Sequence, residues 1–453
     1  MSRRIRTGIF FAFITIFIIA TGLISLSASG YRFNPSWPPQ FNRLLIKTGM
    51  LIVSSLPSGA NVYLNDELLI ASTSKLWSDK YLNTEAKIKN LLPGEYLLRL
   101  ERDGYWTWEK TISIQPGQTN HVLNVNLFRT DQPQLIYPAQ AKELKLSSSR
   151  RYLYAQGEEK IISLRNGESL SLKNDNSNNQ NSDQPAAALP GAWRNNSDEL
   201  LLGSRLFSPT RGLIADYSDL IGAGIKSRYD DSYDRIYYLN NGSLAYLNPA
   251  RRTINTVLNQ KNILSYEARG DIIWYLSVDK NRALVKKYSL SSEAEEVYQS
   301  LPINGDYEFK NGRAGQVAIY DSQNNALYLL DSSTPLKEPL ILADVLGWEW
   351  LNDKTLLYHN NWEIYRLDIK SGSSYLLTRL SQTIKKIIWQ PNRNYLLVLT
   401  DQGLFAYDLR LETLTNIFMT QNIISPVLDQ NANALYFQAE IDDQSGIYRL
   451  RLQ

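Results

Sequence analysis

A segment of about forty residues recurs along most of this chain. Eight short apolar clusters, each preceded by polar residues, mark the copies: 152–155, 200–202, 236–239, 272–275, 317–320, 356–358, 396–399 and 435–437. The seven intervals between Leu153 and Leu435 average about forty residues, the period of a four-stranded propeller blade. One blade cannot bury both of its faces, so the copies must stack on one another. We therefore expect residues 131–453 to form a seven- or eight-bladed β-propeller, with a continuous solenoid as the alternative.

The later copies show the internal plan of a repeat. Residues 390–394 form a polar turn before the apolar cluster 396–399, and the next strand ends in Asp408. Such turns resemble degenerate versions of the Ser-Pro-Asp-Gly turn of TolB-like β-propellers, with Asn392 and Asp353 at matching positions. The resemblance covers about 320 residues and implies an architecture rather than an activity. Residues 446–452 are expected to form a final strand at the closing position of the ring.

Residues 8–28 contain no ionisable side chain. About twenty helical residues span roughly 30 Å, the thickness of the hydrocarbon core of a bilayer. Arg3, Arg4 and Arg6 precede this segment, and basic residues favour the cytoplasmic side. We predict a cytoplasmic tail at residues 1–7 and a single transmembrane helix at 8–28, with the rest of the chain extracellular.

A cleaved secretory signal is the alternative for this segment. The small residues Ser27, Ala28 and Ser29 would permit cleavage. However, the apolar run from Ile9 to Ser25 exceeds the roughly 7 to 15 residues of most signal peptides. A retained signal anchor is therefore the prediction.

Composition excludes several classes of function. The 48 basic residues include Arg3, Arg4 and Arg6, and residues 1–29 contain no acid, so the remaining 45 basic residues are balanced by 45 acidic ones. This balance argues against nucleic acid as a partner, because nucleic-acid binding requires a basic excess. With no cysteine, the chain has no disulfide or thiolate metal site, and two histidines leave little scope for zinc or histidine-based proton transfer. We expect no cofactor and no metal.

Between the apolar segment and the repeats lie a spacer, residues 29–48, and a compact β unit, residues 49–130. Three prolines in residues 30–40 predict that the spacer has no regular structure. In the β unit, strands at 50–55, 61–65, 95–100, 106–114 and 121–128 are separated by turns. The turn residues that we single out are Pro57, Gly59, Ala60, Gly94, Gly104, Tyr105 and Gly117.

The ordered set of turns resembles a PEGA domain, named for a Pro-Glu-Gly-Ala turn in which Ser58 stands here for Glu. The resemblance covers about 80 of the 453 residues. It implies a small β-sandwich-like module of bacterial surface proteins, without catalysis. The fold class expected for the whole chain is thus an all-β ectodomain, a PEGA module plus a propeller, behind one transmembrane helix.

Three further patterns are interpreted as structural. Residues 173–186 are rich in Asn, Asp and Ser and should be a disordered loop. The acidic residues near Asp429 and Glu440 resemble a calcium loop but occupy a blade-turn position. Asp230, Asp231 and Asp234, and also Asp442 and Asp443, would serve glycoside hydrolysis only if folding paired their carboxylates, and such residues usually form polar turns.

No catalytic motif occurs, so we expect a non-catalytic protein of the cell envelope. Its propeller face would bind a cell-wall polysaccharide or another envelope protein, because loops from several blades converge there. One alternative is a glycan-active hydrolase or lyase with carboxylates in the central funnel. Another is an assembly factor for exported proteins, by analogy with TolB-like propellers.

Overall fold

The computed structural model describes residues 3–33, 45–70, 81–172, 191–222, 225–259, 261–279, 282–310, 312–313, 315–420, 422–429, 431 and 433–453. The chain divides into two compact units, one of residues 1–130 with Thr413–Ile417 and Gln453, the other of Asp131–Glu412 and Phe418–Leu452. The predicted loop at 173–186 lies outside the described residues, as does the middle of the predicted spacer, residues 34–44.

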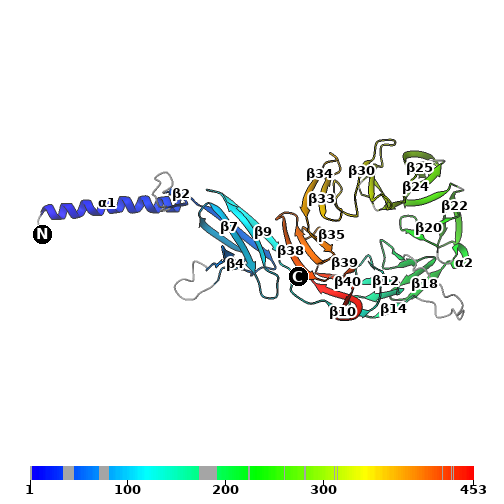
Figure 1. Cartoon of the computed structure of the whole chain (residues 1–453), viewed down its shortest axis with the longest axis horizontal. Coiled ribbons are helices and arrows are strands. Elements are labelled where there is room, and N and C mark those ends of the chain that lie inside the picture. Colours follow the sequence, from blue (N-terminus) through cyan, green and yellow to red (C-terminus); the bar gives the residue numbers. More distant parts are fainter. Residues whose placement is uncertain are drawn as a thin grey trace. The chain divides into compact units, whose positions relative to one another are not determined.

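The apolar segment forms helix α1 (Arg3–Ala28), drawn in dark blue in Figure 1. The helix begins five residues before the predicted transmembrane segment. Within it, Arg6–Ala28 is, among the described residues, the one stretch of helix long and apolar enough to cross a membrane. A secretory signal passes the same test of length and composition.

The spacer has some regular structure at its ends, contrary to the prediction. Strand β1 (Tyr31–Phe33) pairs antiparallel with β2 (Leu45–Lys47). Thr48 reinforces this ladder, because its N–H and its hydroxyl both donate to the carbonyl of Gly30 at 2.7 Å. The pairing partners lie too far apart in sequence for local patterns to reveal them.

Residues 49–126 form two sheets. The three-stranded sheet has the order β6 (Ala86–Leu91), β3 (Gly49–Leu56), β9 (Thr119–Asn126), and the four-stranded sheet has the order β5 (Glu67–Leu68), β4 (Asn61–Leu64), β7 (Gly94–Glu101), β8 (Trp108–Ile114). Along β3, buried residues alternate strictly with partly exposed ones. Leu51 and Val53 of β3 and Leu98 and Leu100 of β7 are fully buried, as expected for two sheets that share a core. Two predicted bounds shift: β8 begins at Trp108 rather than Trp106, and β9 runs two residues earlier than predicted.

The repeats form eight four-stranded sheets within the described part of the chain. The first four blades are β11 (Glu143–Leu146), β12 (Tyr152–Gln156), β13 (Lys160–Ser163), β14 (Ser169–Ser171); β15 (Gly191–Trp193), β16 (Leu200–Leu202), β17 (Arg205–Ser208), β18 (Gly212–Asp216); β19 (Ser227–Asp230), β20 (Arg235–Asn240), β21 (Ser243–Asn248), β22 (Thr253–Leu258); and β23 (Ile263–Arg269), β24 (Ile272–Asp279), β25 (Arg282–Ser289), β26 (Glu295–Pro302). A short helix, α2 (Ser218–Ile221), follows the second of these blades.

The next three blades are β27 (Tyr307–Lys310), β28 (Gln316–Asp321), β29 (Ala326–Asp331), β30 (Leu340–Leu342); β31 (Gly347–Asn352), β32 (Thr355–His359), β33 (Glu363–Asp368), β34 (Ser374–Arg379); and β35 (Ile384–Gln390), β36 (Tyr395–Thr400), β37 (Gly403–Asp408), β38 (Thr413–Met419). All eight apolar clusters of the repeat fall on the second strand of a blade. Those strands are the most buried, because blades pack through them; one core cluster joins Leu357 of one blade to Ile387 and Leu396 of the next.

The eighth blade closes the ring. Its order is β10 (Gln134–Pro138), β41 (Gln444–Arg451), β40 (Ala434–Ile441), β39 (Ile424–Leu428). Gln134 pairs with Arg449 and Pro138 with Gly446, so the first strand of the propeller completes the sheet made by the last three. This confirms the closing position predicted for the C-terminal strand and sets the number of blades at eight rather than seven.

The first strand of each blade lies nearest the centre of the ring. Strand β11 contacts β15, β23 contacts β27, and β31 contacts β35, which are all first strands of neighbouring blades. In the eighth blade the corresponding strand is β39, at the opposite edge from β10, and it contacts β11. In Figure 1 the sheets are arranged around this centre, from β12 in green-cyan to β40 in red. Side chains of the first strands are therefore placed to meet around one axis.

Candidate functional site

Charged side chains concentrate on the first strands. Three of these strands carry an acid followed two residues later by a base: Glu143 and Lys145 on β11, Glu267 and Arg269 on β23, and Glu308 and Lys310 on β27. Residues two apart on a strand share a face, so each acid meets its own base. The N–O distances in these three pairs are 3.2, 2.9 and 2.6 Å.

One ion pair reaches past an intervening blade. Lys226, just before β19, places its Nζ 3.2 Å from Oε1 of Glu308 on β27, although the blade β23–β26 lies between them in sequence. The carboxylate of Glu308 is thus held by both Lys226 and Lys310. Burial alone would raise the pKa of Glu308, but the hydrogen bond from Lys310 and the two lysine charges lower it below its ordinary value. Glu308 stays ionised as a structural anion.

A cavity of about 190 Å³ opens beside this ion pair. Its wall includes Lys226, Arg228, Leu264, Ser265, Tyr266 and Glu308. We call it the axial cavity, because all but one of its residues come from the innermost strands β19, β23 and β27 or directly precede β19, the exception being Leu239 on β20. Arg228 is half-buried, and its guanidinium makes no hydrogen bond or ion pair with any other residue that the structure describes.

A second charged group lies on the first strands of other blades. Burial raises the pKa of Glu349 on β31 to about 7, and the charges of Lys386 and Arg313 oppose this only in part. Lys386 on β35 has its pKa lowered by burial, against the opposing charges of Glu349 and Glu143, and its Nζ donates to the carbonyl of Pro426 at 3.2 Å. Glu143 belongs to a blade that is not adjacent to the blade of Lys386, so these groups also converge on the axis.

Another cavity, of about 450 Å³, has no charged residue in its wall. It is lined by amide, hydroxyl and apolar groups, among them Asn240, Ser243, Thr256 and Asn259. Amides and hydroxyls can both donate and accept hydrogen bonds, which suits a neutral ligand rich in hydroxyl groups.

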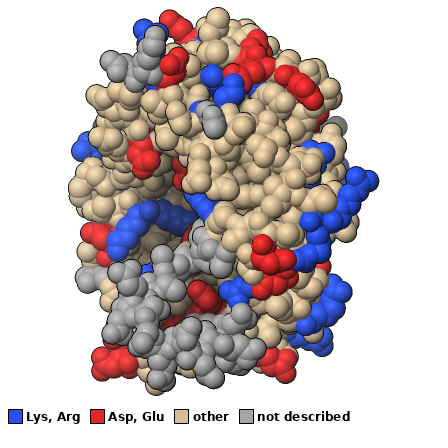
Figure 2. All heavy atoms as spheres, turned by 90° about the vertical axis from the view of Figure 1, so that its right-hand side faces the viewer, with Lys and Arg blue, Asp and Glu red and all other residues tan. Residues whose placement is uncertain are grey.

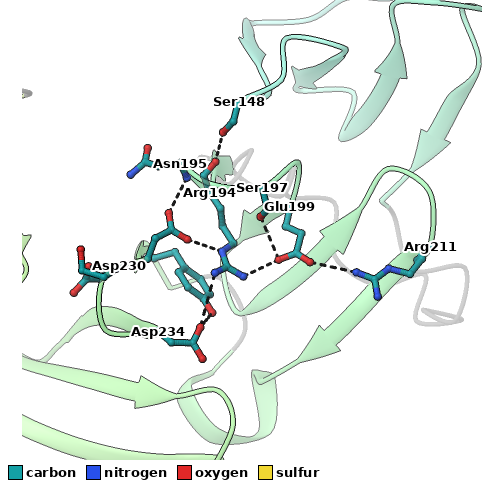
Figure 3. Close-up of polar contacts among 11 residues, drawn as sticks. Ser148, Arg194, Asn195, Ser197, Glu199, Arg211, Asp230 and Asp234 are labelled. Atoms are coloured by element: carbon teal, nitrogen blue, oxygen red, sulfur yellow. Dashed lines mark hydrogen bonds and ion pairs between the residues drawn. The ribbon is translucent and has the colours of Figure 1, made fainter.

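The acidic residues at 230–234 do not form a carboxylate pair for catalysis. In Figure 3 Asp230 lies apart, whereas Asp234 lies beside Arg194, which follows β15. Its Nε donates to Asp231 at 2.8 Å and its Nη1 donates to Glu199 at 2.7 Å. Asp234 instead accepts a hydrogen bond from the hydroxyl of Tyr229, and Asp230 accepts the N–H of Ser232 at 3.0 Å within its own turn.

This group, which we call the Arg194 cluster, joins three blades. The guanidinium of Arg194 lies 3.9 Å from the centroid of the Tyr229 ring on β19, and the carbonyl of Arg194 accepts a hydrogen bond from Ser148 of the preceding blade. Asp231 also accepts the N–H of Asn195 at 2.8 Å. The bonds of Arg194 and Asp231 hold neighbouring blades together, which makes the cluster structural.

The other acidic candidates also lie in turns. Asp442 and Asp443 have φ of 50° and 61° and form the two-residue turn between β40 and β41. Asp429 accepts the N–H of Asn433 at 2.8 Å, so the segment that resembles a calcium loop is a blade turn, as predicted. No cluster of three metal-ligating side chains occurs among the described residues.

The turn residues of the β unit occupy the ends of its strands. Pro57, Gly59 and Ala60 connect β3 to β4, where the N–H groups of Gly59 and Ala60 both donate to Oγ1 of Thr84 at 3.0 Å. Gly59 has φ of 89°, which glycine adopts without strain. Ala60 is fully buried.

The remaining turn residues serve similar roles. Gly94 begins β7, Gly104 accepts the N–H of Thr130, and the N–H of Gly117 donates to Thr48, each of the two bonds at 3.0 Å. Tyr105 stands between two guanidinium groups, those of Arg102 and Arg129, at 5.2 and 5.7 Å from its ring centroid. None of these residues lines the axial cavity. Arg3, Arg4 and Arg6 lie in the first turns of α1.

Sequence reasoning missed the axial residues. A usable signal was present: the acid-x-base triplet recurs at the start of three repeats, at 143–145, 267–269 and 308–310. Only the circular arrangement shows that such strands share a centre. By contrast, the face drawn in Figure 2 has acidic and basic side chains interspersed, in keeping with the balanced charge of the sequence.

A family model matches one of the two units. Residues 48–130 match the model of the PEGA domain. No curated protein matches the chain. Among solved structures, the chain is similar to the dihydro-heme d1 dehydrogenase NirN (13% identity, 62% of this chain and 67% of that chain, TM-score 0.46) and to an oligogalacturonate lyase in complex with manganese (9% identity, 90% and 98%, TM-score 0.41). It is also similar to the Pan2 WD40 domain of Neurospora crassa (10% identity, 69% and 89%, TM-score 0.39). At these identities and TM-scores the likenesses carry no argument about activity.

Proposed function

We propose that this chain, in which a PEGA domain at residues 48–130 is followed by an eight-bladed β-propeller, is a non-catalytic protein of the bacterial cell envelope that binds a cell-wall polymer through the propeller. The observation that carries the proposal is the axial cavity. It is a concave site of about 190 Å³ on rigid inner strands, where charged groups converge from several blades.

Charge pairing supports binding rather than catalysis. Glu143, Glu267 and Glu308 each meet a base on the same strand at 3.2 Å or less. For Glu308 the two lysines lower the pKa of the carboxyl, so its protonated form is disfavoured and it is poorly placed to transfer a proton to a substrate. Such groups can fix the orientation of a ligand without changing it chemically.

Helix α1 supports the proposed location. We propose that it is a retained signal anchor, with Arg3, Arg4 and Arg6 in the cytoplasm and the residues after α1 outside the cell. A propeller tethered to the membrane in this way would meet the polymers of the envelope without needing to be recruited. Another envelope protein is the alternative partner for the same surface.

The test is co-sedimentation with purified cell wall. The full chain in nanodiscs is incubated with insoluble wall, and the bound fraction is compared with that of empty nanodiscs, while the supernatant is assayed for released reducing sugars. We expect saturable retention without release. If the protein is not retained at any concentration, the proposal is wrong.

Glu349 favours one second candidate, a glycan-active hydrolase or lyase. A carboxyl group with a pKa of about 7 could donate a proton at neutral pH, and both Glu349 and Glu143 act on Lys386. This candidate predicts that wall fragments are released by the wild type and that Glu349→Gln abolishes the release. Retention without release by either protein would exclude it.

A further inference from the structure

We infer that the axial cavity binds an anionic group, a phosphodiester or a carboxylate, carried on the envelope polymer. The inference rests on the proposed function and specifies its ligand. It starts from the charges around the cavity: Lys226 and Arg228 line it, and Lys310 stands beside Glu308. Lys226 and Lys310 contact Glu308, and Arg228 is a third cation, whose charge acts on Glu267.

Glu308 alone does not neutralise this set. Glu308 receives Lys310 at 2.6 Å on one oxygen and Lys226 at 3.2 Å on the other, so its charge is shared between two lysines. The side chain of Lys226 remains 67% exposed, which leaves ammonium hydrogens available to a ligand. The nearby Glu267 is paired with Arg269 at 2.9 Å. Only Oε1 of Glu267 is bonded, since its Oε2 has no hydrogen-bond partner, and the charge of Arg228 also acts on this carboxyl. Four cations, Lys226, Arg228, Arg269 and Lys310, thus face the two acids Glu267 and Glu308, so positive charge is left over.

Arg228 supplies the second, independent observation. Its guanidinium is half-buried in the cavity wall and has no hydrogen-bond or ion-pair partner among the described residues. A guanidinium carries five N–H donors arranged to match a carboxylate or phosphate. A bound anion would give these donors charge-assisted hydrogen bonds in place of contacts with water.

The size and the apolar part of the cavity point to one group of a longer chain. Drug-sized ligands occupy roughly 300 Å³ or more, and about 190 Å³ is smaller. Leu264 and Tyr266 contribute apolar surface beside the cations. Such a wall can contact the carbon skeleton of a sugar or polyol while Arg228 and Lys226 contact its charged substituent.

The experiment measures binding of three soluble polymers to the full chain in phosphatidylcholine nanodiscs, whose lipids carry no net charge. The polymers are poly(glycerol phosphate), polygalacturonate and neutral dextran, and poly-glutamate serves as an acidic peptide. The wild type is compared with a variant carrying Lys226→Gln and Arg228→Gln. The matched control carries Lys337→Gln and Arg379→Gln, which removes the same charge from exposed positions away from the first strands.

We expect poly(glycerol phosphate), polygalacturonate or both to bind, and dextran not to bind. The Lys226→Gln, Arg228→Gln variant should bind about tenfold more weakly or worse, because charge-assisted hydrogen bonds are lost, whereas the control should bind like the wild type. Binding should also weaken as salt is raised. The anionic polymer that binds more tightly identifies the substituent as phosphate or carboxylate.

Other outcomes overturn the inference and separate it from the proposed function. If wall is retained equally by the wild type and by the Lys226→Gln, Arg228→Gln variant, the protein binds a polymer but not through these cations. If dextran binds as tightly as the anionic polymers do, the conclusion is the same: the protein binds a polymer, but not through these cations. Binding of poly-glutamate alone would assign the cavity to an acidic protein. Failure to bind wall at all overturns both proposals.

Discussion

Arg194 shows how one residue can join three propeller blades, since its side chain contacts one neighbouring blade and its carbonyl the other. Its guanidinium pairs with Asp231, whose side chain is only 7% exposed, and with Glu199, which is 19% exposed. We expect Arg194→Ala to destabilise the propeller by about 2 to 3 kcal/mol, because it leaves partly buried carboxylates without a counter-charge. Thermal unfolding followed by circular dichroism measures the effect.

Arg211→Ala is the matched control for that substitution. Arg211 pairs with the same Glu199, but at 3.4 Å and with 69% of its side chain exposed. Exposed pairs contribute about 1 kcal/mol or less, so this variant should unfold close to the wild type. Equal losses in the two variants would show that Arg194 does not clamp the blades.

Glu349 should make the stability of the propeller depend on pH. The carboxyl has a pKa of about 7 in the folded protein and 4.5 as its ordinary value, so between these values the folded state binds more protons than the unfolded state. Stability therefore falls as pH rises through this window, by up to about 3 kcal/mol. Lys386 and Arg313 are the facing cations, and their charges oppose the effect of burial on Glu349.

Glu349→Gln should remove this dependence. We expect the variant to unfold like the wild type at pH 5 and at a higher temperature than the wild type at pH 8. Glu296→Gln, a change at an exposed glutamate, is the control and should follow the wild type at every pH. Parallel curves for Glu349→Gln and the wild type would contradict the raised pKa.

At the residue scale, sequence reasoning could assign turns but not partners. Gly59, Gly104 and Gly117 were predictable because a reversal of the chain requires positive φ, and all three adopt it. The interpretation of Asp231 and Asp234 as turn residues was incomplete, because both also face Arg194 of another blade. Pairing across blades depends on the ring, which a local pattern does not contain.

At the scale of elements, Gly446 tests the closure of the ring. It lies on β41 opposite Pro138 of β10, and a Cβ at this position would come within 2.9 Å of the carbonyl oxygen of Tyr137 and 2.2 Å of Leu135. Leu135 can move aside, but the backbone carbonyl cannot do so without shifting the ladder. We expect Gly446→Ala to cost about 1 to 3 kcal/mol, measured by thermal unfolding.

Thr253→Ala provides the comparison for the closing strand. Thr253 lies exposed on β22, the outer strand of an ordinary blade, where a substitution usually changes stability by about 0.5 kcal/mol or less. A loss no greater for Gly446→Ala than for Thr253→Ala would mean that β10 is not tightly held against β41.

The elements that the sequence predicted best are the most buried ones. Every second strand of a blade was found, because a strand covered on both faces reads as an uninterrupted apolar run, as in β36, which is buried throughout. The pairing of β1 with β2 was missed, because three-residue strands with exposed faces leave no such pattern. The predicted start of β8 was two residues early, because the aromatic pattern extends beyond the N-terminal end of the strand, to Trp106.

For the whole molecule, retention of α1 is directly measurable. The intact chain has a mass of 51.8 kDa. We expect the membrane-extracted protein to have this full mass and to resist release by alkaline carbonate, because a helix of about twenty apolar residues stays in the bilayer. A mass lower by about 29 residues, together with release into the soluble fraction, would identify a cleaved signal instead.

The overall architecture was predictable, whereas the chemistry of its centre was not. The forty-residue period specifies stacked blades, and only the number of blades remained open between seven and eight. The position of Lys226 beside Glu308 depends on how tightly the ring closes, which is a global property. The axial cavity could therefore be inferred only once the eight sheets were in place.

The pairing of β10 with β41 constrains the order of events when the protein is made. Gln134 emerges from the ribosome long before its partner Arg449, and an unpaired strand is open to wrong partners. Contacts so distant in sequence form slowly, because the chain between them must be ordered first. The ring therefore closes last, and until β41 has been made and paired the propeller has an open seam between β10 and β41.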